Sequence, residues 1–230
     1  SWGYNPSYFL APDKYYGPKN RLKEFIDSCH RRGIAVIMDI ALNHTTGDNP
    51  LAKLYWNSST NQPAANNPWL NVSATHPYNV FNDFNHESLA TRYFTSRVVE
   101  HWLQEYKVDG FRFDLMGIHD LETMNLVARE LRKVKPDILL YGEGWTAGSS
   151  PLTEEKRALK KNVDQLEGIA VFSDEFRDGL KGSVFVPTQK GFVSGDTSRI
   201  ASIKFGLKGG WANPRQMISY ADCHDNHALW

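Results

Sequence analysis

The stretch "ESLATRYFTSRVVEHWLQEYKVDGFRFDL" (residues 87–115) decides the fold, because an amphipathic helix runs in it directly into a strand. Apolar residues recur at helical spacing over residues 87–106, whereas "VDGFRFDL" (108–115) has the composition of a short buried strand. Arg112 and Asp114 add two charges to that strand, two positions apart and therefore on the same face. The stretch predicts one helix–strand unit with a charged pair at the end of its strand.

The same order of helix and strand recurs along the chain and predicts a parallel α/β fold with five strands. Each expected strand is a short apolar run, and charged or amphipathic segments separate the strands. The expected helices are residues 19–32, 87–106, 120–134 and 154–167, and the expected strands are residues 33–42, 108–115, 137–145, 168–174 and 216–226.

Two long segments interrupt this alternation. Residues 45–82 are rich in Asn, Pro and Ser and form an excursion from the C-terminal end of the first expected strand. Residues 186–214 form a second insertion, which is rich in glycine. Long loops in a compact domain usually carry function, so we expect both segments to lie near a site.

Composition and net charge argue against several classes of binding partner. The chain has 230 residues, of which 41% are hydrophobic and 13% aromatic, so it can bury a core and offer rings to a sugar. Lys+Arg and Asp+Glu are both 26, which gives a net charge of zero and argues against nucleic acid or an anionic membrane as partner. We find no apolar run long enough to span a membrane, no signal-peptide pattern, and no metal-binding spacing around Cys29 and Cys223.

Polar residues gather where the expected strands end. Taken singly, an aspartate at such a position more often caps a helix, and a histidine more often belongs to the core. In a parallel barrel, however, the C-terminal ends of the strands line a single face, where active sites are built. The residues at these ends are Asp39, Asn43, His44, Arg112, Asp114, Glu143, His224 and Asp225.

Retaining glycoside hydrolysis requires such a set, because one carboxylate attacks the anomeric carbon while a second, protonated carboxyl group donates to the leaving oxygen. Arg112 beside Asp114 is expected to lower the pKa of that carboxyl group and keep it ionised. Glu143 lies between Gly142 and Gly144, so we expect it to be distant from cations, partly desolvated and protonated more easily.

Five motifs in order resemble those of the alpha-amylase superfamily, glycoside hydrolase family 13: "DIALNH" (39–44), "DFN" (83–85), "GFRFD" (110–114), "GEGW" (142–145) and "CHDN" (223–226). The resemblance implies that Asp114 is the nucleophile, Glu143 the general acid/base and Asp225 the third catalytic carboxylate. The residues that it implies for substrate binding are Tyr4, His44, Arg112, Trp145 and His224. The resemblance implies that Asp39 has a structural role and takes no part in the reaction.

The resemblance also bears on metal binding. Asn43 and Asp83 match positions that ligate a structural calcium ion in many amylases, and their oxygen atoms suit that ion. Many debranching members of the superfamily lack the ion. We therefore expect that no cofactor is required, with calcium as a possible ligand of Asn43 and Asp83.

The superfamily fold is a (β/α)8 TIM barrel, and the five expected strands correspond to its strands three to seven. Residues 1–230 would then be a partial catalytic domain without strands one, two and eight, and residues 45–82 a short excursion like domain B of the superfamily. Such an open section exposes two sheet edges. The isolated chain is therefore expected to be poorly soluble and inactive.

The two halves of the chain resemble different subgroups. Residues 105–230 closely resemble type I pullulanases, with "DLMG" (114–117) as the most specific mark, whereas residues 1–104 resemble other members of the superfamily. The resemblance implies hydrolysis of α-1,6 branches in pullulan, starch or glycogen, at an extracellular, periplasmic or cell-surface location.

Two alternatives remain open. An α-1,4-acting amylase or neopullulanase, or a transglycosylase, would have the same carboxylates and differ only in its sugar subsites. An inactive carbohydrate-binding barrel would normally have lost one of the three carboxylates, and all three are present in this chain.

Overall fold

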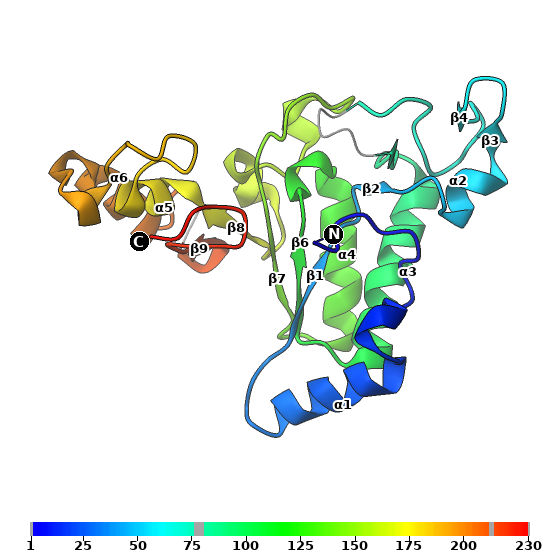
Figure 1. Cartoon of the computed structure of the whole chain (residues 1–230), viewed down its shortest axis with the longest axis horizontal. Helices are drawn as coiled ribbons and strands as arrows, with labels where there is room; N and C mark the ends of the chain where they lie inside the picture. Colours follow the sequence, from blue (N-terminus) through cyan, green and yellow to red (C-terminus); the bar gives the residue numbers. More distant parts are fainter. Residues whose placement is uncertain (1, 76–80, 212–213, 230) are drawn as a thin grey trace.

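The computed structural model describes residues 2–75, 81–211 and 214–229. Its main element is a five-stranded sheet with the order β1-β6-β7-β8-β9, in which every neighbouring pair is parallel (Figure 1). The predicted parallel α/β fold is therefore confirmed, and each strand lies inside its predicted range. The strands are β1 (Ile37–Ile40), β6 (Gly110–Phe113), β7 (Leu139–Gly142), β8 (Ala170–Ser173) and β9 (Met217–Ser219).

Successive side chains of β6 point to opposite faces of the sheet, so the hydrophobic core lies on one face and the polar residues on the other. Phe111 and Phe113 are fully buried and belong to the hydrophobic core, while Arg112 and Asp114 point to the opposite face. Register brings Arg112 next to Asp39 of β1 on one side and Tyr141 of β7 on the other. Side chains of three consecutive strands of the sheet therefore meet at one level.

Three of the four predicted helices are confirmed: α1 (Lys19–His30), α3 (Leu89–Tyr106) and α4 (Leu121–Val134). The helices α3 and α4 pack against each other beside β6 (Figure 1). Side chains cap both N-termini, because Ser88 accepts a hydrogen bond from the backbone of Ala90, and Asp120 accepts one from Thr123.

The prediction of a helix over residues 154–167 is wrong. The segment forms two short 3-10 helices, η3 (Glu154–Lys156) and η4 (Lys160–Gln165), which are separated by extended backbone at Arg157. Arg157 is buried and donates to the carbonyl oxygens of Gly117 and Thr146. These tertiary contacts hold the chain extended, so they override the local preference for helix.

Both insertions contain regular structure. The described residues of the first form two short antiparallel strand pairs and one short helix: β2 (His44–Thr45), α2 (Pro50–Leu54), β3 (Trp56–Asn57), β4 (Gln62–Pro63) and β5 (Asn82–Asp83). The second insertion contains a helix, α6 (Ile200–Leu207), although its glycine content predicts a loop. This helix packs on α5 (Asp174–Lys181), and Gly206 allows the two helices to approach closely at Phe176. Short 3-10 helices complete the chain: η1 (Lys14–Tyr16), η2 (Met116–Ile118), η5 (Phe192–Ser194), η6 (Thr197–Arg199) and η7 (Pro214–Gln216). Among the described residues, no helix combines the length and the apolar character that crossing a membrane requires.

Candidate active site

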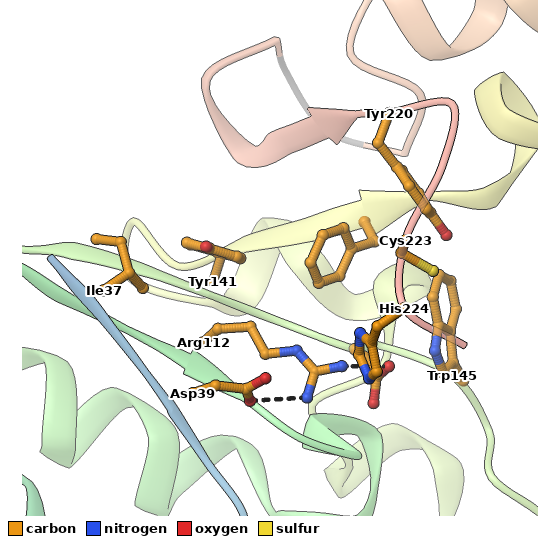
Figure 2. Close-up of a pocket in the computed structure, with 10 residues that line it drawn as sticks. Ile37, Asp39, Arg112, Tyr141, Trp145, Tyr220, Cys223 and His224 are labelled. Atoms are coloured by element: carbon orange, nitrogen blue, oxygen red, sulfur yellow. Dashed lines mark hydrogen bonds and ion pairs between the residues drawn. The ribbon is translucent and has the colours of Figure 1, made fainter. Parts of the chain in front are cut away.

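The guanidinium group of Arg112 connects three carboxylates from three strands. Its Nη1 atom lies 2.9 Å from Asp39 Oδ1 (Figure 2) and 3.1 Å from Asp114 Oδ1. Its Nη2 atom lies 2.5 Å from Glu143 Oε1. Arg112, Asp114 and Glu143 are each less than 10% exposed. A buried cation is tolerated only with close counter-ions, so this group orders the ends of β1, β6 and β7 around itself.

Burial dominates the protonation of both inner carboxyl groups. It raises the pKa of Asp114 above its usual value, although Arg112 and Asn43 oppose the shift. Burial likewise raises the pKa of Glu143, against opposing contributions from Arg112 and the backbone N–H of Leu115. Each carboxyl group therefore holds its proton more strongly than it would in water.

Two expectations about these carboxyl groups are corrected. The prediction that Arg112 leaves Asp114 with a low pKa is wrong, because desolvation outweighs the nearby cation. Glu143 was expected to be distant from cations, but it lies nearer to the guanidinium than Asp114 does. The expectation that desolvation favours its protonated form is confirmed.

Asn43 contacts Asp114 directly, and His44 contacts Asn43. Asn43 Nδ2 donates to the backbone oxygen of Asp114 at 3.0 Å and to its Oδ2 atom at 3.2 Å. His44 is buried, and its Nδ1 atom lies 2.5 Å from Asn43 Oδ1, which fixes the orientation of the amide. His44 therefore reaches Asp114 through Asn43.

An aromatic pair lies over the guanidinium. The rings of Tyr4 and His224 stack with centroids 5.5 Å apart, and Arg112 Cζ lies 5.6 Å from the centroid of the Tyr4 ring. The Tyr4 hydroxyl donates to Asp39 Oδ2 at 2.5 Å, and burial together with Asp39 raises its pKa. Asp39 therefore belongs to the site, although the motifs give it only a structural position; its pairing with Arg112 becomes visible only in the folded sheet.

Asp225 and Trp145 complete the set of predicted residues around Arg112. Asp225 is exposed, with its Oδ1 atom 3.2 Å from His224 Nε2, and its charge contributes to raising the pKa of Glu143. Trp145 follows Glu143 by two positions and stacks on Phe172, with ring centroids 6.5 Å apart.

Of the residues above, five line a cavity of about 230 Å³ on the polar side of the sheet (Figure 2): Asp39, Arg112, Glu143, Trp145 and His224. Sequence reasoning missed several of its lining residues. Tyr141 lies two positions before Glu143 on β7, so strand alternation could have revealed it. The lining residues are Ile37, Asp39, Arg112, Tyr141, Glu143, Trp145, Phe172, Tyr220, Cys223 and His224. A cavity with aromatic walls and the buried carboxyl group of Glu143 suits a neutral sugar.

The chain is similar to pullulanases along its whole length, including residues 1–104. It is 35% identical to the pullulanase of Bacillus subtilis strain 168, over 100% of the chain and 34% of that protein. It is 29% identical to the pullulanase of Klebsiella pneumoniae, over 100% of the chain and 26% of that protein. The chain thus spans about a third or less of the length of these relatives. No protein-family model matches it.

Solved structures agree with this similarity. The crystal structure of type I pullulanase from Bacillus subtilis strain 168 complexed with maltose matches with a TM-score of 0.89 at 34% identity. It covers 100% of this chain, which corresponds to 34% of that chain. A mutant pullulanase from Paenibacillus barengoltzii complexed with maltotetraose matches with a TM-score of 0.88 at 34% identity, over 100% of this chain and 38% of that one. The α/β fold with its parallel sheet is therefore that of pullulanase structures.

Asn43 Oδ1 and Asp83 Oδ2, which were proposed for calcium, each accept hydrogen bonds from protein groups, and these bonds disfavour a shared ion. Asn43 turns its amide nitrogen, a donor, toward Asp114, and its oxygen accepts from His44. Asp83 Oδ2 accepts from the backbone N–H and the hydroxyl group of Thr75, at 2.5 and 2.9 Å. Calcium takes six to eight oxygen ligands. Within residues 2–75, 81–211 and 214–229, no three His, Cys, Asp or Glu side chains are grouped to hold a metal.

Removal of metal should therefore leave the stability of this region unchanged. A calcium ion present at 100 times its Kd would stabilise the folded state by about 2.7 kcal/mol, which raises the melting temperature by several degrees. Thermal unfolding of the full-length protein with and without EDTA measures the effect, and Asp83→Asn is the matched control. A drop of several degrees that calcium restores, and that is lost in Asp83→Asn, would show that the ion binds here.

Proposed function

We propose that the chain is part of a glycoside hydrolase of the alpha-amylase superfamily that cleaves α-1,6 branches of pullulan, starch or glycogen with retention of configuration. The observation that carries the proposal is the Arg112 guanidinium, which bridges the buried carboxyl groups of Asp114 and Glu143. The five ordered motifs and the similarity to pullulanases support it.

In the proposed reaction, Asp114 attacks the anomeric carbon while Glu143 gives its proton to the departing glycosidic oxygen. A covalent glycosyl-enzyme results. Glu143, now ionised, then removes a proton from a water molecule that attacks the same carbon and releases Asp114. Asp225 would hold sugar hydroxyl groups near the developing positive charge.

The reaction needs one proton shared between Asp114 and Glu143, and the charges around Arg112 favour that state. Arg112 can neutralise only one of its three carboxylate neighbours, so a proton on Glu143 reduces the excess buried negative charge. Asp114 accepts hydrogen bonds from both Arg112 and Asn43, which favour its ionised form. The two carboxyl groups can thus take different roles although burial raises the pKa of each.

The proposed ligand is a neutral α-glucan. Tyr4 and Trp145 would offer aromatic faces to glucose rings, and Arg112 and His224 would hold hydroxyl groups. His44, which the motifs place among the substrate-binding residues, would act through Asn43 as a positioning residue. The relatives' names favour α-1,6 cleavage.

We also propose that residues 1–230 are strands three to seven of a (β/α)8 catalytic barrel, with residues 45–82 as a domain-B-like excursion. The parallel strand order and the partial coverage of the pullulanase structures support this assignment. By the same resemblance, the full-length protein would act in the extracellular space, in the periplasm or at the cell surface.

Cleavage of pullulan by the full-length protein that contains this chain tests the function. Maltotriose as the sole product means α-1,6 cleavage, whereas panose or isopanose would indicate an α-1,4-acting enzyme.

Asp114→Asn should lower kcat by at least about 10³-fold, because the nucleophile is lost. The exposed Asp137→Asn is the matched control and should retain activity. Turnover that survives in Asp114→Asn would contradict the assignment of the nucleophile.

The pH profile tests the electrostatic role of Arg112. Without the guanidinium, the pKa of both Asp114 and Glu143 should rise, since Arg112 opposes the effect of burial on each. Arg112→Gln should therefore move both limbs of the kcat/KM profile to higher pH and lower its maximum by about 10²-fold or more. The exposed Arg129→Gln should leave the profile unchanged. Limbs that stay in place in Arg112→Gln would contradict this role.

Expression of residues 1–230 alone tests the barrel assignment. In the described sheet, β1 pairs only with β6 and β9 only with β8, so both edges expose unpaired backbone groups. The isolated chain should therefore be poorly soluble and cleave no pullulan, while the full-length protein is soluble. A soluble monomer of residues 1–230 with full pullulan-cleaving activity would overturn the assignment.

A further inference from the structure

The ammonium group of Lys160 lies between two tryptophan rings. Its Nζ atom is 5.7 Å from the ring centroid of Trp145 and 5.9 Å from that of Trp211. Both distances are within the range of cation–π attraction. Trp145 lines the cavity (Figure 2), whereas Trp211 belongs to the second insertion. One lysine therefore connects the cavity wall to a segment distant in sequence.

Two carboxylates at the start of α5 hold this ammonium group. Lys160 Nζ pairs with Asp174 and, at 2.7 Å, with Glu175 Oε1. The same Glu175 oxygen accepts a hydrogen bond from Trp211 Nε1 at 3.0 Å. The side chains of all three charged residues are less than 30% exposed, so solvent screens these contacts less than it would at the surface.

The backbone of Lys160 is fixed as well. Its N–H donates to the carbonyl oxygen of Gly144, the residue before Trp145, at 2.9 Å. The approach is so close that a Cβ atom on Gly144 would lie 2.6 Å from the Lys160 nitrogen. The Trp145 ring therefore contacts Phe172, on which it stacks, and a cation that is held at both its backbone and its side chain.

We propose that Lys160 is a positioning residue that holds Trp145 as the sugar-stacking wall of the cavity, with Trp211 and the two carboxylates as its support. The inference rests on the proposed function and identifies what fixes the aromatic wall for a glucose ring of an α-glucan. Lys160 pairs with Asp174 and Glu175 rather than with Asp114 or Glu143, so it acts on binding and leaves the bond-breaking step alone.

Steady-state kinetics on pullulan, with the full-length protein, test the inference. Lys160→Met keeps the length of the side chain and removes its charge, so KM should rise about three- to tenfold while kcat stays within about twofold. Lys160→Arg keeps the charge and the cation–π contact and should restore KM to near the wild-type value. The neighbouring Lys161→Met, which loses only a contact with Glu154, is the matched control and should match wild type.

Several outcomes would overturn the inference. A KM for Lys160→Met equal to that of Lys161→Met would do so, as would a fall in kcat with unchanged KM. Near-UV circular dichroism checks the fold of each variant. Should Lys160→Met fail to fold, Glu175→Gln serves instead, because it removes one ion pair and keeps an acceptor for Trp211. A wild-type KM in Glu175→Gln would then contradict the role of Lys160. A wild-type protein that cleaves no α-glucan would instead overturn the proposed function itself.

Discussion

A buried guanidinium group determines the geometry of this protein's polar face. Arg112 is 6% exposed, and an unpaired charge at that depth would cost several kcal/mol. Asp39, Asp114 and Glu143 therefore converge on it from β1, β6 and β7. These contacts depend on the strand register, because a slip of one residue would turn Arg112 into the apolar core and Phe111 or Phe113 into the cavity.

Hydrogen bonds extend outward from the carboxylates around Arg112. Asn43 connects the buried His44 to Asp114, and Tyr4 connects Asp39 to the aromatic wall. Burial favours the protonated form of both Asp114 and Glu143, and the guanidinium group opposes it at each. A site of this kind can hold one proton between two carboxyl groups, which is what acid catalysis with a carboxylate nucleophile requires.

Local periodicity predicted the five strands of the sheet and the long helices α1, α3 and α4, because each buries an apolar face at regular spacing. It failed at residues 154–167, where the helix-like composition is overridden by the burial of Arg157 against Gly117 and Thr146. The C-terminal ends of the expected strands predicted which residues belong to the site, but they did not predict the contacts between those residues. That Glu143 touches Arg112, and that Asp39 joins the site, depends on distances across the sheet that strand spacing alone cannot provide.

The most direct test is to trap the covalent intermediate in the full-length protein. An activated fluorinated glucosyl donor slows the second step, so that the sugar stays on the nucleophile, and peptide mass spectrometry then identifies the labelled residue. The proposed reaction predicts one sugar unit on Asp114. A label on Glu143 or Asp225 would contradict the assignment of the two carboxyl groups that the guanidinium group joins.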